Sequence, residues 1–360
     1  LSIRRQRQMC IRDRIYFNDD LVLQEGYISM SPSFSANTRY IGFFEARLND
    51  ADQIFIMASV DDPAIASTVD RAIVVLDYDA MAGTFTETVR FKEADVLPGQ
   101  TEAVADFGTG PHEMAFNNAG QVLFVADMAG DTTRDTAIYR DGTLLAQEGS
   151  ASPVAGRNFT SLLGRGMAIG GTGRYVFKAQ LAGDAMSDQI IILDGLKFVQ
   201  EGDVLPAVSP FVLENYGLAS GAIGVSDAGD VLWFGDWNDA DTTRDTGLFL
   251  NDVLLVQEGV TVINGEIVTA IASGQDAFAI SPNGRHVIFE ATLASGLEGA
   301  CTIGIDSGCL PDWNNDDQVN SQDFFDFLAD FFVGTADFNT DGQTNSQDFF
   351  DFLVAFFAGC

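Results

Sequence analysis

The apolar positions of this chain follow two different periods. From Ile15 to about Asp306, short apolar runs alternate with turn residues, mainly Gly, Asn and Asp, and no convincing helical period is present. Runs of this length between such turn residues are typical of β-strands. In about the last fifty residues, two short segments instead carry apolar side chains at i, i+3, i+4 and i+7, the spacing of a helix face. The pattern predicts a mainly β body followed by a small helical unit.

The β pattern repeats along the body. Four segments share an apolar strand, a tight turn at Asn or Gly, and a second strand ending in an aromatic and a small residue. They are MAFNNAGQVLFVADMAG from Met114, MAIGGTGRYVFKAQLAG from Met167, IGVSDAGDVLWFGDWND from Ile223 and FAISPNGRHVIFEATLA from Phe278, with a worn copy from Ile28. A second hairpin ending in Gln-Glu-Gly follows three of the copies, and IYFNDDLVLQEG stands alone near the N-terminal end.

The spacing of these copies indicates a blade. Glu148, Glu201 and Glu258 lie 53 and 57 residues apart, and four aromatic residues lie 53 to 57 apart, namely Phe124, Phe177, Phe234 and Phe289. Four strands in roughly 55 residues, repeated in tandem, are the signature of a propeller blade. We predict a β-propeller of about five or six four-stranded blades over residues 15–306, irregular at about 27–97 and with half-blades at both ends. A β-sandwich array or a β-solenoid is the alternative that remains open. The turn segment SPNGRHVIF also resembles the blade motif of TolB-like propellers.

The C-terminal unit, residues 307–360, contains a duplicated loop. Aligning DWNNDDQVNSQDFFDFLADFF with DFNTDGQTNSQDFFDFLVAFF gives a 25-residue repeat with Asp, Asn, Asp, Asn and Asp at loop positions one, three, five, nine and twelve. Oxygen ligands at these positions suit Ca²⁺. The first predicted site uses Asp312, Asn314, Asp316, the Gln318 carbonyl, Asn320 through water, and Asp323. The second uses Asp337, Asn339, Asp341, the Gln343 carbonyl, Asn345 and Asp348.

Each loop runs into a segment with a wide apolar stripe. The stripe comprises Phe324, Phe325, Phe327, Leu328, Phe331 and Phe332 in the first copy, and Phe349, Phe350, Phe352, Leu353, Phe356 and Phe357 in the second. We expect each helix to bury this stripe against the other copy. An acidic amphipathic helix pair without metal is the alternative.

One loop followed by one helix in each repeat resembles the type I dockerin module, in the variety that ends in Gly-Cys, here Gly359 and Cys360. The resemblance covers about the last fifty residues and implies a cohesin-like or cell-envelope partner. The sixth loop position, where calcium loops favour Gly, is Gly342 in the second copy but Asp317 in the first. We therefore expect the second loop to bind calcium more tightly.

Residues 1–14, LSIRRQRQMCIRDR, differ from the rest and look like translated sequencing adaptor. We exclude them from the fold as a non-native segment; a basic arm or the start of a signal peptide is the alternative. On this interpretation the gene is truncated upstream, and a signal peptide is a candidate for part of the missing sequence. The net charge of −33 becomes −37 without them. So acidic a chain disfavours nucleic acid as a partner, and no run of eighteen apolar residues predicts a membrane span.

The body offers few candidate catalytic groups. The glutamates of the Gln-Glu-Gly corners, including Glu25, recur in every repeat, which favours a structural role. The twin DTTRDT loops at 131–136 and 241–246 could hold calcium, but such side chains more often bond local backbone. The two histidines, His112 and His286, have no Cys or second His nearby in sequence, so no zinc set is predicted. A carboxylate pair for glycoside chemistry could come from distant loops.

Cysteine pairing depends on the dockerin-like arrangement. With Cys10 set aside, three cysteines remain. In a dockerin-like pair with pseudo-twofold symmetry, the entry to the first loop and the exit of the second helix come close, which implies a Cys309–Cys360 bond. A Cys301–Cys309 bond and three reduced thiols are the alternatives. A disulfide would indicate an oxidising compartment.

These features together predict a secreted or cell-surface protein. We expect a non-enzymatic recognition or scaffold body, with a possible glycan ligand, attached or sorted through the calcium-binding unit. The alternative is an extracellular polysaccharide hydrolase or lyase with its site in the propeller funnel. Acidic and aromatic residues converging at one mouth of the funnel would favour the enzyme.

Overall fold

The computed structural model describes residues 14–65, 70–108, 114–217, 221–305, 311–314, 318–339 and 342–358. The chain divides into two compact units, Leu1–Thr302 and Ile303–Cys360. The first consists of antiparallel sheets and the second carries two helices. The prediction of a mainly β body followed by a small helical unit is confirmed. In the part of the chain that is described, no helix is long and apolar enough to cross a membrane.

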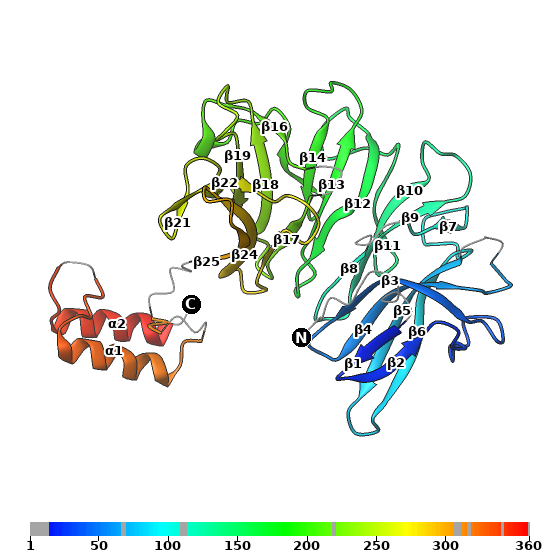
Figure 1. Ribbon diagram of the computed structural model, residues 1–360, viewed down its shortest axis with the longest axis horizontal. Coiled ribbons are helices and arrows are strands. Elements are labelled where there is room, and N and C mark those ends of the chain that lie inside the picture. Colours follow the sequence, from blue (N-terminus) through cyan, green and yellow to red (C-terminus); the bar gives the residue numbers. More distant parts are fainter. Residues whose placement is uncertain are drawn as a thin grey trace. The chain divides into compact units, whose positions relative to one another are not determined.

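Among the described residues, the first unit holds one hairpin and five sheets (Figure 1). The hairpin is β1 (Arg14–Phe17) and β2 (Asp20–Gln24). The first sheet is β3 (Tyr40–Leu48), β4 (Gln53–Val60), β5 (Asp70–Asp79) and β6 (Thr84–Lys92). The second is β7 (Val104–Asp106), β8 (Met114–Phe116), β9 (Val122–Met128), β10 (Thr136–Arg140) and β11 (Thr143–Gln147). The third is β12 (Phe159–Ile169), β13 (Tyr175–Leu181), β14 (Gln189–Leu193) and β15 (Leu196–Gln200).

The fourth sheet follows a 3₁₀ turn at Pro206–Val208 and comprises β16 (Leu213–Asn215), β17 (Ile223–Val225), β18 (Val231–Trp237), β19 (Thr246–Leu250) and β20 (Val253–Gln257). The fifth is β21 (Val262–Ile263), β22 (Glu266–Ile271), β23 (Phe278–Ile280), β24 (His286–Leu293) and β25 (Glu298–Gly304). The helices are α1 (Ser321–Val333) and α2 (Ser346–Ala358). The strand β1 begins at Arg14, one residue before the predicted start of the native fold.

The sheets are variations on one four-stranded meander. In the first and third sheets the strands pair in chain order. In the second and fourth, two short strands share the innermost position, since β7 and β8 both pair with β9, and β16 and β17 both pair with β18. In the fifth, β22 and β23 share it beside β24, and β25 also pairs with β24. The repeats are therefore propeller-like blades.

The outer hairpins of the repeats share one construction. The pairs β1–β2, β10–β11, β14–β15 and β19–β20 each have a register shift at the same place. Each turn starts with an Asn or Asp in the left-handed conformation, with φ of 48°, 48°, 49° and 54° at Asn18, Asp141, Asp194 and Asn251. Asn and Asp tolerate this conformation, which two-residue hairpin turns require. The isolated hairpin β1–β2 therefore has the structure of the third and fourth strands of a sheet.

Neighbouring sheets pack face to face through separate apolar cores. The central strands β9, β13 and β18 are buried on both faces, because each lies between two neighbours. The hairpin β1–β2 packs on the first sheet in the same way, through Ile15, Phe17 and Leu23. The equivalent strand of the first sheet, β4, is buried in the same way. The equivalent strand of the fifth sheet, β24, differs, because its residues are alternately exposed and buried.

The strand register corrects one predicted alignment. Ile223 lies opposite Trp233 in the fourth sheet, where Met114 lies opposite Phe124 in the second. Trp233 is therefore the repeating aromatic residue, and Phe234 is not. A shift of one residue turns a side chain to the other face of the sheet. Trp233 is fully buried and stacks on Phe249 with ring centroids 4.6 Å apart.

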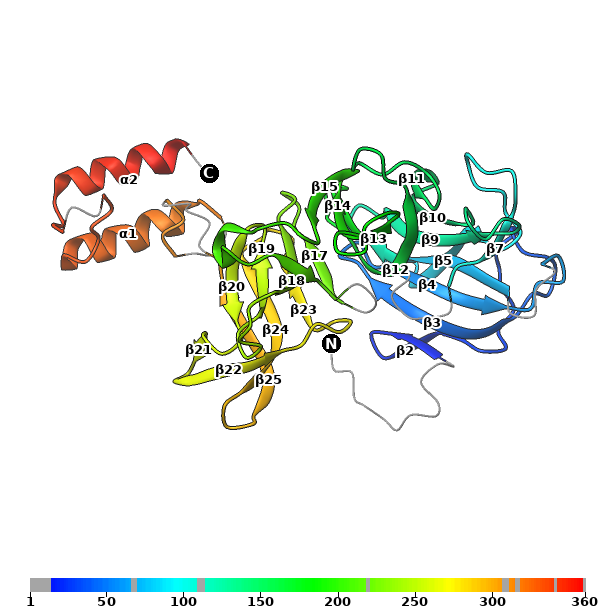
Figure 2. The same ribbon diagram turned by 90° about the horizontal axis from the view of Figure 1, so that it is seen from above.

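The two helices of the second unit lie side by side around an aromatic core (Figure 2). Phe327 and Phe352, equivalent in the 25-residue repeat, are fully buried and stack with centroids 3.9 Å apart. Trp313 packs edge-on against Phe327 at 5.0 Å and donates a hydrogen bond through Nε1 to Asp330 at 2.9 Å. The predicted packing of one copy on the other is confirmed at these positions.

The predicted apolar stripe is too wide, however. Phe325 and Phe332 are 61% and 80% exposed, and their equivalents Phe350 and Phe357 are 59% and 81% exposed. A helix with one neighbour buries only one face. Residues next to each other in sequence are about 100° apart around a helix, so each Phe-Phe pair places its second ring outside the contact.

Candidate functional site

The first predicted calcium loop ends in the opening turn of α1. Asp323, at position twelve, is fully buried. Its Oδ2 accepts a hydrogen bond from the backbone N–H of Asn320 at 2.8 Å, and its Oδ1 accepts one from that of Asn314 at 3.2 Å. The side chain of Asn320 caps α1 by accepting from the backbone of Gln322 at 2.8 Å. The Gln318 carbonyl accepts from the Asn320 side chain at 3.0 Å. Positions three, nine and twelve are thus held together.

The second loop repeats these bonds. Asp348 is fully buried and accepts from the backbones of Asn345 at 2.7 Å and Asn339 at 3.2 Å. The N–H of Asn345 holds the pKa of Asp348 below its ordinary value. Asn345 also accepts from the backbone of Gln347 at 2.8 Å, and the Gln343 carbonyl lies 3.5 Å from its amide nitrogen. The duplication seen in sequence is therefore a duplication of structure.

The residue at position six of the second loop, Gly342, has the turn conformation that calcium loops favour there. Gly342 is left-handed, with φ of 86°, and its N–H donates to Oδ2 of Asp337 at 2.7 Å. A residue with a Cβ is strained in this conformation. The equivalent Asp317, and the position-five ligands Asp316 and Asp341, lie outside the described residues.

The C-terminal unit has buried carboxylates and no basic side chain, a charge balance that favours a bound cation. Asp312 is 3% exposed, and Asp323 and Asp348 are fully buried, yet residues 303–360 contain no Lys, Arg or His. Backbone N–H groups offset part of the cost of burying Asp323 and Asp348, but no basic side chain of the unit supplies positive charge. The donor set consists of carboxylate, amide and carbonyl oxygens, which suits Ca²⁺ rather than a softer metal. Within the described ranges, no group of three or more Asp, Glu, His or Cys is placed to hold a metal ion.

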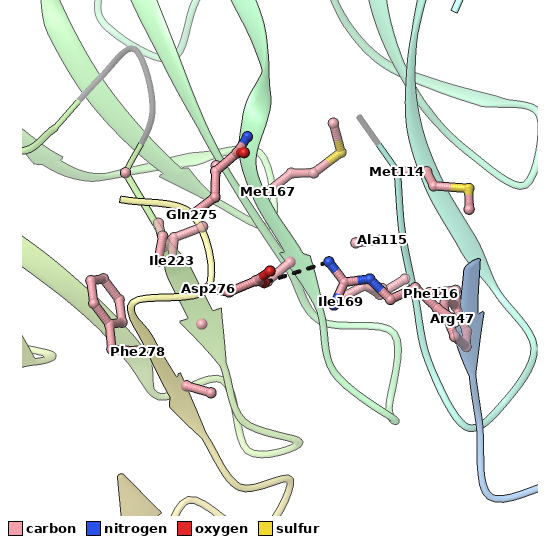
Figure 3. Close-up of a pocket in the computed structure, with 16 residues that line it drawn as sticks. Arg47, Met114, Ala115, Phe116, Met167, Ile169, Ile223, Gln275, Asp276 and Phe278 are labelled. Atoms are coloured by element: carbon pink, nitrogen blue, oxygen red, sulfur yellow. Dashed lines mark ion pairs between the residues drawn. The ribbon is translucent and has the colours of Figure 1, made fainter. Parts of the chain in front are cut away.

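A second candidate site lies where the innermost strands of the five sheets meet. A cavity of about 260 Å³ is lined by β3, β8, β12, β17 and β23 (Figure 3). Arg47 and Asp276 point toward each other across it, with Nη2 and Oδ1 3.5 Å apart. Arg47 also pairs with Glu45 at 2.7 Å. Although burial opposes the charge of Arg47, these two carboxylates raise its pKa.

Sequence reasoning missed this cavity, although a signal for it was present. The second-last residue of the innermost strand is small in four consecutive sheets: Ala115, Ala168, Gly224 and Ala279, all of which line the cavity. A Cβ at Gly224 would come within 2.9 Å of Ile280. Asp276 is the one carboxylate among the described lining residues, and both it and the neighbouring Glu45 are paired with the Arg47 guanidinium.

A buried lysine lies directly behind the cavity wall. Lys178 of β13 is fully buried, and its Nζ donates to the carbonyls of Tyr216, Gly217 and Ala222 at 3.0, 3.1 and 3.3 Å. A Cβ at Gly221 would lie 2.4 Å from this nitrogen. Burial lowers the pKa of Lys178 to about 7. The side chain fastens the segment between β16 and β17 to the third sheet.

The repeated glutamates take the structural role favoured by the sequence. Glu201 accepts hydrogen bonds from the backbones of Asp188 and Gln189 at 3.0 and 3.2 Å. Glu258 accepts from the hydroxyl of Thr246 at 2.5 Å. Burial raises the pKa of Glu148 and Glu201. Glu201 and Glu258 thus join the end of the fourth strand to the start of the third, whereas Glu25 is exposed.

A carboxylate cluster in the fourth sheet gives a pH-dependent prediction. Burial, with the charges of Asp245, Glu214 and Glu258, raises the pKa of Asp236 from 3.8 to about 6. The folded state then binds a proton more tightly than the unfolded state, so this group stabilises the fold below about pH 4 and loses that contribution as the pH rises through 6. We expect Asp236→Asn to raise the unfolding free energy at pH 7 by about 1 kcal/mol, because the group is partly exposed and screened.

Urea unfolding of both proteins at pH 4 and pH 7 checks this prediction. The gain should be present at pH 7 and absent at pH 4, whereas Asp252→Asn, in an exposed turn, should change little at either pH. An equal gain at both values would contradict the role of charge.

The DTTRDT loops are held by their own side chains. Oδ1 of Asp131 accepts from the backbone and hydroxyl of Thr133 at 3.1 and 2.8 Å. Asp241 does the same with Thr243 at 3.2 and 2.7 Å. These bonds confirm the local role expected from the sequence.

The other candidate residues from the sequence are the histidines and the cysteines. His286 lies on β24, and His112 lies outside the described residues. Cys301 is a free, half-buried thiol on β25. Cys10, Cys309 and Cys360 fall outside the described residues, so the Cys309–Cys360 bond stays a prediction.

Fold and sites together define a protein of propeller-like repeats with a C-terminal unit of two loop-helix repeats. No family model matches the chain, and no curated protein matches it. Among solved structures, the WD40 domain of SCAP from fission yeast is similar, with 9% sequence identity, 80% of this chain and 70% of that chain covered, and a TM-score of 0.29. A likeness at this level specifies no function.

Proposed function

We propose that this chain is a secreted or cell-surface recognition or scaffold protein whose C-terminal unit binds calcium through two dockerin-like loops. The observation that carries the proposal is the duplicated bonding of Asp323 and Asp348. In both loops a fully buried carboxylate is oriented by the backbones of positions three and nine.

The chain's own residues prepare the two loops for a cation. The Asn320 and Asn345 side chains fix the first turns of the helices, and the aromatic core fixes the distance between them. Bound calcium would supply positive charge to carboxylates that have no basic side chain in their unit. Binding free energy of this kind adds directly to the stability of the folded state.

For the body we propose recognition or scaffolding rather than catalysis. The corner glutamates Glu201 and Glu258 are engaged with strand ends, and the carboxylate of Asp276 is paired with Arg47. A polysaccharide hydrolase uses a pair of carboxylates, and the two beside the central cavity, Glu45 and Asp276, are both engaged by Arg47. A glycan array on the whole chain tests recognition, and assays on the bound glycans test cleavage.

Partners and location follow from the same proposal. The C-terminal unit would meet a cohesin-like or cell-envelope partner, and an extracellular setting would supply calcium and permit the Cys309–Cys360 bond. With 52 acidic and 19 basic residues, nucleic acid is not a proposed partner.

Substitution of the position-twelve carboxylates tests the calcium proposal. We expect wild-type protein to bind two calcium ions in isothermal titration, and Asp323→Asn and Asp348→Asn to bind one each. The site left in Asp323→Asn should be the tighter, by about tenfold, because Gly342 adopts the left-handed backbone without the strain of an Asp.

The matched control is Asp326→Asn, on α1 and outside both loops, which should retain two sites. If both loop variants bind calcium as the wild type does, the loops are not the binding sites and the proposal is wrong.

A further inference from the structure

The central cavity carries an excess of negative charge. Arg47 and Asp276 are the charged residues among its described lining. The Nε of Arg47 lies 2.7 Å from Oε1 of Glu45, whose side chain is 5% exposed. Glu45 therefore already balances the charge of Arg47. The carboxylate of Asp276, which comes from the segment between β22 and β23, is a second negative charge beside one guanidinium.

The carboxylate of Asp276 is open to a further cation. Its side chain is 64% exposed, and its Oδ1 lies 3.5 Å from Nη2 of Arg47. This distance is longer than that of a charge-assisted hydrogen bond, so Arg47 binds Asp276 weakly. A carboxylate has about four lone-pair sites, so it can accept from a ligand ammonium group as well as from Arg47.

The walls of the cavity suit the apolar part of such a ligand. Met114, Met167 and Phe278 line it and are buried (Figure 3). Thioether and aromatic side chains adapt to apolar groups and attract organic cations. A cavity of about 150 Å³ holds benzene. The volume of about 260 Å³ therefore suits a molecule of roughly ten non-hydrogen atoms.

A second basic residue, Lys178, lies behind the cavity wall and does not reverse this preference. Its Nζ donates to the carbonyls of Tyr216, Gly217 and Ala222, whose oxygens offset its charge. Burial also lowers the pKa of Lys178 to about 7, so part of the population is neutral at pH 7. The net charge of the chain, −33, attracts cations over a longer range.

We propose that the central cavity binds a small organic cation, namely a primary ammonium group on an apolar body of one ring or a short chain. The ammonium group lies at Asp276, and the apolar body lies against Met114, Met167 and Phe278. The proposal rests on the recognition role proposed for the first unit and gives that role a ligand class. It does not depend on the calcium loops.

Three probes of similar shape and different charge test the ligand class. They are 2-phenylethylamine, 2-phenylethanol and 3-phenylpropionate, titrated into the whole chain and followed by ligand-observed NMR at pH 7 and low salt. Saturating calcium is present, so that the acidic loops of the C-terminal unit do not take up the amine. We expect the amine to bind with a Kd of about 1 mM or tighter, as a ligand of roughly nine non-hydrogen atoms can. The alcohol should bind about tenfold more weakly, and the anion should not bind up to about 10 mM.

Two variants place the site in the cavity. Asp276→Asn should weaken binding of the amine at least about tenfold, because it removes the charge that the ammonium group meets. Ala279→Leu should weaken it similarly, because the larger side chain fills the cavity from an exposed position of its lining. Asp252→Asn, in the exposed turn between β19 and β20, is the matched control and should bind as the wild type does. Urea unfolding checks the folding of each variant, and the probe series on the wild type decides the proposal if a variant does not fold.

A wild-type chain that does not bind the amine up to about 10 mM overturns the proposal. Binding of the anion as tightly as the amine also overturns it, as does an Asp276→Asn variant that binds the amine like the wild type. A chain that binds a glycan on the array but no amine would keep the recognition role and reject this ligand class. Calcium binding is measured separately, through Asp323 and Asp348, and none of these results changes it.

Discussion

Removal of calcium is expected to unfold the C-terminal unit and to leave the sheets of the first unit folded. Without the cation, Asp312, Asp323 and Asp348 are buried negative charges in a segment that has no basic residue. The remaining core is a small cluster of aromatic rings around Phe327 and Phe352. A unit of under 60 residues with so small a core needs an additional source of stability.

Circular dichroism and thermal unfolding of the whole chain, in calcium and in excess EDTA, measure this effect. We expect the helical signal to fall in EDTA, and a separate low-temperature transition to appear that calcium shifts upward. Magnesium serves as the control, because it demands a tighter octahedral site and should restore much less. Identical curves in calcium and EDTA would mean that the unit is stable without metal.

Replacement of Lys178 is expected to cause the largest loss of stability in the first unit. Lys178→Ala leaves a cavity and removes the donor from three carbonyls, two of them in buried bonds, which should cost at least about 3 kcal/mol. Lys178→Met retains most of the packing and should cost about 1 to 3 kcal/mol. Lys197→Met is the matched control, since Lys197 is partly exposed on β15 and its ion pair with Asp203 contributes less than about 1 kcal/mol.

The effect of Lys178 should also depend on pH. Burial lowers its pKa from 10.5 to about 7, so the unfolded chain binds the proton more tightly than the folded one. Between pH 7 and about 10, stability therefore rises with pH for wild type relative to Lys178→Met, and the difference levels off below pH 7. Urea unfolding across this range checks the slope, and a difference that falls as pH rises would contradict it.

The repeat could be predicted from the sequence because each copy has the same residue types at its hairpin turn and strand end. Asn or Asp at the hairpin turn, followed by Gln-Glu-Gly, gave four hairpins with the same bulge. The register inside the sheets could not be derived with equal certainty. Trp233 and Phe234 are adjacent and both aromatic, and only the strand pairing decides which one faces which core.

The sequence also could not predict which side chains are exposed in the last sheet of the repeat. Ile288 lies in a strand with the same alternation as the inner copies, and its exposure depends on the absence of a covering sheet in the described part of the chain. The same limit applies to Phe332 and Phe357. Their spacing predicts a helix face, but the number of neighbours around that helix decides whether the face is buried.

The two candidate sites differ in how far apart in sequence their residues lie. The predicted calcium loops are local, so ligand spacing alone indicated Asn314, Asn320 and Asp323, and the structure brings these together. The central cavity joins residues more than 200 positions apart, such as Arg47 and Asp276, and no local pattern links them. The one sequence feature that indicates this cavity is the small residue repeated in the innermost strands.

The central claim, two calcium-binding loops at the end of a repeat body, is tested most directly by native mass spectrometry of the whole chain. With calcium at saturating concentration, we predict two bound ions per chain, and none in a protein that carries both Asp323→Asn and Asp348→Asn. A wild-type chain without bound calcium, or a double variant that still holds two ions, would contradict the account.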